Sequence, residues 1–324
     1  EAVMKNCEDR DLRAEIHQAF FARGREAPWN NRPLIPKILE LRREKAELLG
    51  YPDFPDYRLE EQMAGSGKQA RDFVAEVVER TRPFWERDFG ELESHARTLG
   101  IEPLEPWDVA FVAEHLQRDR YELDDEELRP YFPLDSVLEG LFETGRRLFG
   151  FTVVEQKVEE TWHPDVRYFE MTDENGVFLG GFYIDLFPRP DKQQGGWMND
   201  LSYGTPEPDG RVPPHLGVIC ANFPPASKER PALLTHRDVQ TLFHEYGHLL
   251  HHLSSRVPIP RRGGVSVAWD WVELPSQLLE NWTWERESLD LFARHWETEE
   301  RLPNELFQRM QRARRFLGGW RQMR

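Results

Sequence analysis

Apolar residues in the first 150 positions have the spacing of amphipathic helices. Between Asn31 and Gly50 they recur every three or four positions, as Leu34, Ile35, Ile38, Leu39, Leu41, Leu48 and Leu49. Asn31 suits an N-cap, and Pro33 suits a first helical turn. Three further segments share this spacing: 68–98, 107–119 and 134–149. We therefore predict a helical lobe over residues 1–150.

The pattern changes after residue 150, where β-branched and aromatic residues become frequent. Residues 166–171 and 177–187 lie on either side of Asn175-Gly176. Two β-rich runs around an Asn-Gly pair are a strong hairpin signal. Residues 216–221 form a short apolar run, which is typical of a buried strand. We therefore predict a hairpin followed by a third strand.

A long helix follows these strands. Thr235 and Asp238 form a capping-box pattern, with Asp in place of the usual Glu or Gln. The helix that they open is predicted to end near Ser254. We assign residues 151–324 to one region that contains the hairpin and this helix.

Composition excludes several classes of protein. Hydrophobic residues make up 39% and charged residues 31%, as in an ordinary globular protein, and no apolar run is long enough to span a membrane. The net charge of −16 argues against nucleic acid and against an anionic membrane surface as partners. Two distant cysteines, Cys7 and Cys220, do not make a disulfide framework, so we expect a reducing, cytoplasmic location.

The long helix carries the sequence His244-Glu245-Tyr246-Gly247-His248. Histidines four residues apart lie on one face of a helix. Two of their ring nitrogens can therefore reach one zinc ion at about 2.0–2.1 Å. Glu245 lies on the adjacent edge, where it can accept a proton from zinc-bound water. The alternative is a pair of ordinary helix histidines.

A catalytic zinc takes a third protein ligand and keeps one open position. Metzincins place Gly and His three and six residues after the second motif histidine, where this chain has His251 and Ser254. Thermolysin-like enzymes and aminopeptidases place Glu about 19 or 20 residues on, where Val267 and Ala268 stand. Glu273 lies 25 residues beyond that histidine, at the start of a second predicted helix.

Two runs of sequence, Leu242–His252 and Trp269–Gln277, together resemble the thimet oligopeptidase family of zinc metallopeptidases. Four further segments match that family in the same order: Trp107-Asp108, Arg129–Leu134, Trp162–Val166 and Phe182–Leu186. The resemblance therefore covers most of the chain.

The resemblance implies one zinc ion per chain, bound by His244, His248 and Glu273, with Glu245 as the general base. It also implies a mainly α fold that combines a partial helical lobe with a zincin-like catalytic core and a small β-sheet beside the zinc helix. In this family two lobes flank a deep channel that admits short peptides. Tyr246 stands where the family more often has Phe, a change that we expect to be harmless.

The family also uses a downstream His and several tyrosines to contact substrate and to stabilise the oxyanion. That segment would follow Arg324. We therefore expect residues 1–324 alone to hydrolyse peptides weakly, even with zinc. We also expect the surfaces that normally face the missing segments to be apolar and to favour self-association.

Five further residues are candidates for supporting roles. Gln277 and Glu280 follow Glu273 by four and seven positions, so they share its helical face and can accept a hydrogen bond from a zinc-binding histidine. Solvated helix positions are the alternative. Gly195, Gly196 and Trp197 follow the hairpin, and the glycines would let a peptide backbone approach a sheet edge. An ordinary loop is the alternative there.

Three functional hypotheses follow. The first is a zinc-dependent endopeptidase for short oligopeptides, in which Glu245 activates a zinc-bound water. The second is a non-catalytic fragment that only binds zinc or peptide, although the intact Glu245 argues against it. The third is a dipeptidyl carboxypeptidase of the same family.

Overall fold

The computed structural model describes residues 2–121, 125–205, 207, 209 and 211–323. The chain divides into two compact units, residues 1–123 with 312–324, and residues 124–311. Within the described residues the fold is mainly helical with one small mixed five-stranded sheet, as predicted. No helix in this described part is long and apolar enough to cross a membrane.

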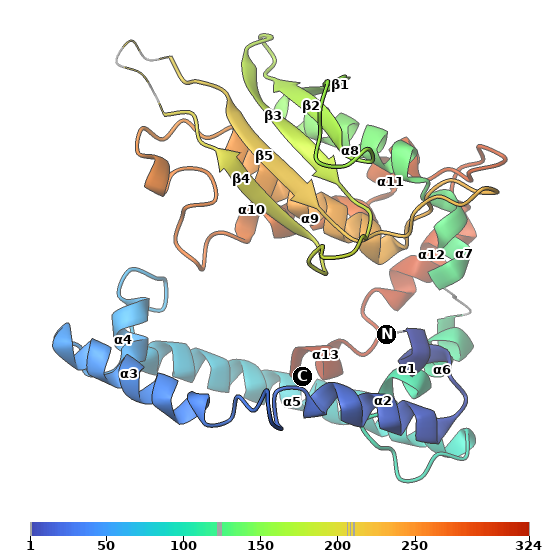
Figure 1. Cartoon of the computed structure of the whole chain (residues 1–324). Helices are drawn as coiled ribbons and strands as arrows, with labels where there is room; N and C mark the ends of the chain where they lie inside the picture. Colours follow the sequence, from blue (N-terminus) through green and yellow to red (C-terminus); the bar gives the residue numbers. More distant parts are fainter. Residues whose placement is uncertain (1, 122–124, 206, 208, 210, 324) are drawn as a thin grey trace. The chain divides into compact units, whose positions relative to one another are not determined.

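The described elements of the first unit are helices (Figure 1). Their bounds are α1 (Ala2–Asn6), α2 (Arg10–Ala22), α3 (Leu34–Leu48), α4 (Phe54–Leu59), α5 (Gly67–Thr98), α6 (Val109–Tyr121) and α13 (Gly318–Met323). A core between α5, α6 and the C-terminal segment contains Leu92, Ala96, Val112, Phe316 and Leu317. Helix α13 packs on α5.

Helix α3 differs in two ways from the sequence prediction. Its N-cap is Pro33, while Asn31 contributes its backbone carbonyl, which accepts a hydrogen bond from the N–H of Leu34. The apolar residues that predicted the helix are exposed, from 46% at Ile38 to 87% at Leu48. The 3.6-residue spacing therefore identified the helix correctly but not a buried face.

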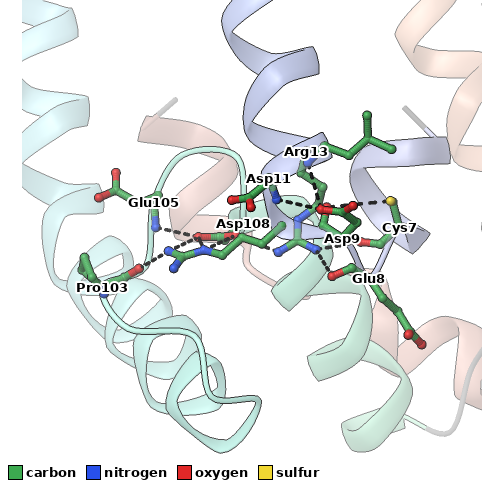
Figure 2. Close-up of polar contacts among 10 residues, drawn as sticks. Cys7, Glu8, Asp9, Asp11, Arg13, Pro103, Glu105 and Asp108 are labelled. Carbon is green, nitrogen blue, oxygen red and sulfur yellow. Dashed lines mark hydrogen bonds and ion pairs between the residues drawn. The ribbon is translucent and has the colours of Figure 1, made fainter.

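A buried ion-pair cluster ties α2 to the segment before α6 (Figure 2). Asp108 accepts hydrogen bonds from Arg10 and Arg13, at 2.8 and 2.7 Å, and from the backbone N–H of Glu105. Burial by itself raises the pKa of Asp108, but the hydrogen bonds from the two arginines outweigh it and hold that pKa below its usual value. Asp108, in one of the family-like segments, therefore has a structural role.

The second unit contains the sheet, whose strand order is β1-β2-β3-β5-β4. The strands are β1 (Thr152–Gln156), β2 (Arg167–Thr172), β3 (Phe178–Asp185), β4 (Trp197–Ser202) and β5 (His215–Cys220). β3 and β5 are parallel, and the other neighbours are antiparallel. The predicted hairpin is β2–β3, and Gly176 adopts a φ of 77° in its turn. The strand predicted at 216–221 is β5.

The second unit also contains helices, of which α9 and α8 contact the sheet. The helices are α7 (Asp125–Leu128), α8 (Leu134–Phe149), α9 (His236–Leu253), α10 (Leu274–Glu280), α11 (Arg286–Phe292) and α12 (Asn304–Ala313), with short 3₁₀ turns at Arg129–Tyr131, Pro260–Arg262 and Asn281–Trp284. The predicted capping box at Thr235 and Asp238 opens α9, and Ser254 is its C-cap. Helix α9 lies along one face of the sheet, in contact with β3, β4 and β5 (Figure 1).

The compact units divide the chain at a different place from the boundary predicted at residue 150. Helix α8 belongs to the second unit because it packs on β1 and α11. Phe142 of α8 contacts Phe169 and Phe182 of the sheet and Tyr246 of α9. A helix-rich composition cannot show this, because the contacts join residues more than 25 positions apart.

Candidate metal and catalytic site

Helix α9 brings His244 and His248 together on one face. Their ring centroids lie 4.9 Å apart and their planes are nearly perpendicular, at 83°. His248 is buried and His244 is partly exposed. The helical spacing that predicted the pair is therefore realised in the fold.

Glu273 lies directly before α10 and faces both histidines. Its Oε2 is 3.2 Å from Nε2 of His244 and 3.2 Å from Nε2 of His248. Among the described residues, these three form the one group of His, Cys, Asp or Glu that could hold a metal ion, with all ligand atoms within 4.8 Å of one another. Two ligands of a tetrahedral zinc with bonds of about 2.0–2.1 Å lie roughly 3.3 Å apart. The observed spacings fit a zinc ion.

The hydrogen bond at Nδ1 of His244 strengthens this fit. Its Nδ1 lies 2.7 Å from Oε1 of Glu280, so in the neutral ring Nδ1–H donates to that carboxylate. The lone pair of Nε2 then points at a carboxylate oxygen of Glu273. Two acceptors that face each other repel unless a cation or a proton lies between them. The donor set of two imidazoles and one carboxylate is one that zinc prefers.

Gly247 lets α10 come close enough to deliver Glu273. A Cβ at this position would lie 2.6 Å from the Cα of Ser276 and 2.7 Å from the carbonyl oxygen of Pro275. Both atoms belong to the backbone, so only a glycine permits this approach. Gly247, which directly precedes His248, thus controls how close the third candidate ligand comes.

The two candidate supporting residues on α10 differ in position. Glu280 contacts His244 as described. Gln277 is exposed, and among the described residues its side-chain amide makes no hydrogen bond to either histidine. Nδ1 of His248 is buried without a hydrogen-bond partner in the described part of the chain. The structure therefore brings Glu280, and not Gln277, to His244.

Glu245 is buried, with 7% of its surface exposed. Burial raises its pKa to about 7, and the charge of Glu273 adds to this, while His244 and a hydrogen bond from the backbone N–H of Met198 act in the opposite direction. A carboxyl group with this pKa can both accept and release a proton near neutral pH.

Strand β4 and the glycines before it lie beside Glu245. A Cβ on Gly196 would lie 3.5 Å from Oε1 of Glu245 and 2.5 Å from Cγ2 of Thr241. Gly195 has a φ of 102° and its carbonyl accepts a hydrogen bond from Asn222. β4 is the terminal strand of the sheet, so one of its edges has no partner strand among the described residues.

Trp197, the first residue of β4, lines a different space. It borders a cavity of about 360 Å³ together with Trp162, Lys192 and Asp185. Asp185 accepts hydrogen bonds from Trp162 and Lys192. The structure thus places Gly196 against Glu245, while the indole of Trp197 lines this cavity.

Sequence reasoning missed two contacts at this site. The backbone N–H of Met198 acts to lower the pKa of Glu245, and the hydroxyl of Ser276 donates to Oε2 of Glu273 at 2.9 Å. A backbone donor from a distant strand leaves no signal in the sequence. Ser276 had one, because a residue three positions after Glu273 on a helix can reach it.

Comparison with known proteins places the chain in a family. The profile of peptidase family M3 matches residues 3–324, nearly the whole chain. The chain belongs to peptidase family M3. This confirms the resemblance derived from the motifs around His244 and Glu273.

Several curated M3 peptidases are similar to this chain. Oligopeptidase A of Salmonella typhimurium is 40% identical over 321 residues, which is 97% of this chain and 47% of that protein. Organellar oligopeptidase A of Arabidopsis thaliana is 35% identical over 98% of this chain and 41% of its own length. Dipeptidyl carboxypeptidase of Escherichia coli is 37% identical over 96% of this chain and 46% of its own length. The chain thus spans about half the length of these relatives.

Proposed function

We propose that this M3 chain carries the catalytic centre of a zinc-dependent endopeptidase that hydrolyses short oligopeptides. The supporting observation is the position of Glu273 Oε2, 3.2 Å from Nε2 of both His244 and His248. Because the chain spans about half the length of its relatives, the activity is proposed for the whole protein that contains these residues.

His244, His248 and Glu273 are the proposed ligands of one zinc ion per chain. Zinc, when bound, supplies polarisation of the scissile carbonyl and a lowered pKa for a water molecule. Glu280 orients the ring of His244 through its hydrogen bond to Nδ1.

Glu245 is the proposed general base. It accepts a proton from the attacking water and later passes it to the leaving amine. Its carboxyl group is buried, and the charge of Glu273 lies close enough to raise its pKa. The buried carboxyl of Glu245 lies close to the carboxylate of Glu273, and two such charges repel. This placement would lower stability, so it favours a catalytic role for Glu245.

Peptides are proposed to bind along the free edge of β4. An extended peptide can add to the terminal strand of a sheet through backbone hydrogen bonds. Gly195 leaves open space, with nothing within 4 Å of a Cβ position there, Gly196 packs on Thr241 beside Glu245, and Trp197 contributes to the adjoining surface. A cytoplasmic location and self-association stay predictions from the sequence.

The test is a Glu245→Gln variant of the protein in its longest natural form. The variant should keep one zinc ion and its fold, and lose at least about 10²-fold in kcat/KM on an internally quenched peptide. Near-normal hydrolysis by a zinc-loaded variant would exclude Glu245 as the base. No hydrolysis by the zinc-loaded wild type would favour the non-catalytic alternative.

A second assay separates the two catalytic alternatives. A dipeptidyl carboxypeptidase, the activity named for one relative, acts at a free C-terminus. An endopeptidase should cleave the same peptide with an amidated C-terminus at a similar rate. Loss of cleavage on amidation would support the carboxypeptidase.

A further inference from the structure

Ser276, near the start of α10, is fully buried at 0% exposure. Its hydroxyl lies 2.9 Å from Oε2 of Glu273 and 3.0 Å from the backbone carbonyl oxygen of the same residue. The oxygen that it contacts is the one that faces both histidines. The two acceptors share one hydroxyl proton, and both belong to Glu273.

The contact to the carboxylate is more than a helix-end feature. Serine in a first helical turn often bonds the backbone carbonyl three residues earlier, and that bond requires nothing of the side chain at that position. Here the hydroxyl also reaches the carboxylate of Glu273, which is 49% exposed and has three rotatable bonds. Without a partner that side chain would sample several rotamers.

Ser276 is itself fixed relative to the histidine helix. Its Cα and backbone N would lie 2.6 and 2.9 Å from a Cβ on Gly247, so the two backbones touch at this point. Gly247 directly precedes His248 on α9. The backbone of Ser276 therefore has a defined position with respect to His248, whatever the conformation of the Glu273 side chain.

We propose that Ser276 is a positioning residue that holds the carboxylate of Glu273 in the orientation required to complete the metal site. This inference rests on the proposed zinc site. A hydrogen bond to an ionised carboxylate is stronger than one between neutral groups. Partners that orient a metal ligand in this way typically change metal affinity by about 10–100-fold when removed.

The test compares zinc affinity, measured by competition with a chromophoric chelator, and the visible absorption spectrum of the cobalt-substituted protein. Ser276→Ala should weaken zinc binding by about 10–100-fold and alter the cobalt spectrum. Ser288→Ala is the matched control, because Ser288 is also buried but contacts Thr144, away from the site. It should leave both measurements unchanged.

A second pair of variants separates the hydroxyl from its volume. Ser276→Thr and Ser276→Val add side chains of the same shape, and only Thr keeps the donor. The Ser276→Thr variant should bind zinc at least about 10-fold more tightly than the Ser276→Val variant. Equal affinities within this pair, or wild-type affinity and spectrum in Ser276→Ala, would overturn the proposal.

The outcomes also separate this inference from the proposed function. A wild-type chain that binds no zinc overturns the metal site, and the role of Ser276 with it. If the wild type binds one zinc and Glu273→Ala weakens it while the Ser276 variants do not, only the role of Ser276 is overturned.

Discussion

Oε1 of Glu280 lies 2.7 Å from Nδ1 of His244, across the contact between α10 and α9. This hydrogen bond fixes the ring so that Nε2 points at Glu273. It also selects the tautomer with the proton on Nδ1, which leaves Nε2 free to bind a metal. Glu273, directly before α10, and Glu280, the last residue of α10, thus both contribute to the site.

Removal of this contact should weaken the metal site. We predict that Glu280→Ala lowers zinc affinity by about 10–100-fold, because the ring of His244 loses its orientation. Gln277→Ala is the control from the same helix, since Gln277 is exposed and makes no hydrogen bond to the histidines in the described chain. Chelator competition measures both. A loss of affinity in the Gln277 variant would show that the structure assigns the supporting role to the wrong residue.

A second prediction concerns the contact between α9 and α10. Gly247→Ala should cost about 1–3 kcal/mol of unfolding free energy, because its Cβ would meet the backbone of Ser276. It should also weaken zinc binding, since α10 carries Glu273. Gly90→Ala in α5 is the control, because nothing lies within 4 Å of a Cβ there. That change should be neutral or stabilise by up to about 1 kcal/mol.

The measurement is urea denaturation of both variants, followed by zinc titration. A Gly247→Ala variant as stable as the wild type, with unchanged zinc affinity, would mean that α10 does not approach α9 as closely as the structure indicates.

For a substitution of Tyr246 we predict a gain in stability, in contrast to the loss expected for Gly247→Ala. Its hydroxyl is buried without a hydrogen-bond partner in the described chain, and it lies 3.0 Å from the position of a Cβ on Gly145. Burial also raises the pKa of Tyr246 above its usual value. An unsatisfied buried hydroxyl costs about 1–3 kcal/mol. Tyr246→Phe should therefore stabilise the protein by roughly 1 kcal/mol and leave zinc affinity unchanged.

Tyr203→Phe is the control for this prediction. The hydroxyl of Tyr203 contacts Ser255 and donates to the carbonyl of Val257, so its removal should destabilise by about 1 kcal/mol. Thermal unfolding compares the two variants. A destabilised Tyr246→Phe variant would reveal a partner for the Tyr246 hydroxyl, such as a buried water.

The features that could be predicted from the sequence are local ones. The hairpin around Gly176, the capping box at Thr235 and the histidine pair all depend on residues a few positions apart, and the structure contains each of them. The position of Glu273 came from the family resemblance. Its short distance to the histidines depends on Gly247, whose role needs the packed helices to be seen.

Contacts between segments that are far apart in the chain could not be predicted from the sequence. Phe142 joins α8 to the sheet, and Gly319 of α13 donates a backbone hydrogen bond to Asp88 of α5. Because of such contacts, the first unit ends at residue 123, whereas the sequence predicted a boundary at residue 150. The first unit also includes residues 312–324. Periodicity describes one face of one helix, and does not identify the element that covers it.

Glu273 is proposed to complete a zinc site with His244 and His248. The most direct measurement is the zinc content and affinity of the purified wild-type chain and of its Glu273→Ala variant. One zinc per wild-type chain and a strong loss of affinity in the variant are predicted, because two histidines alone leave the site without its third protein ligand. Equal zinc content and equal affinity in the two proteins would contradict the account.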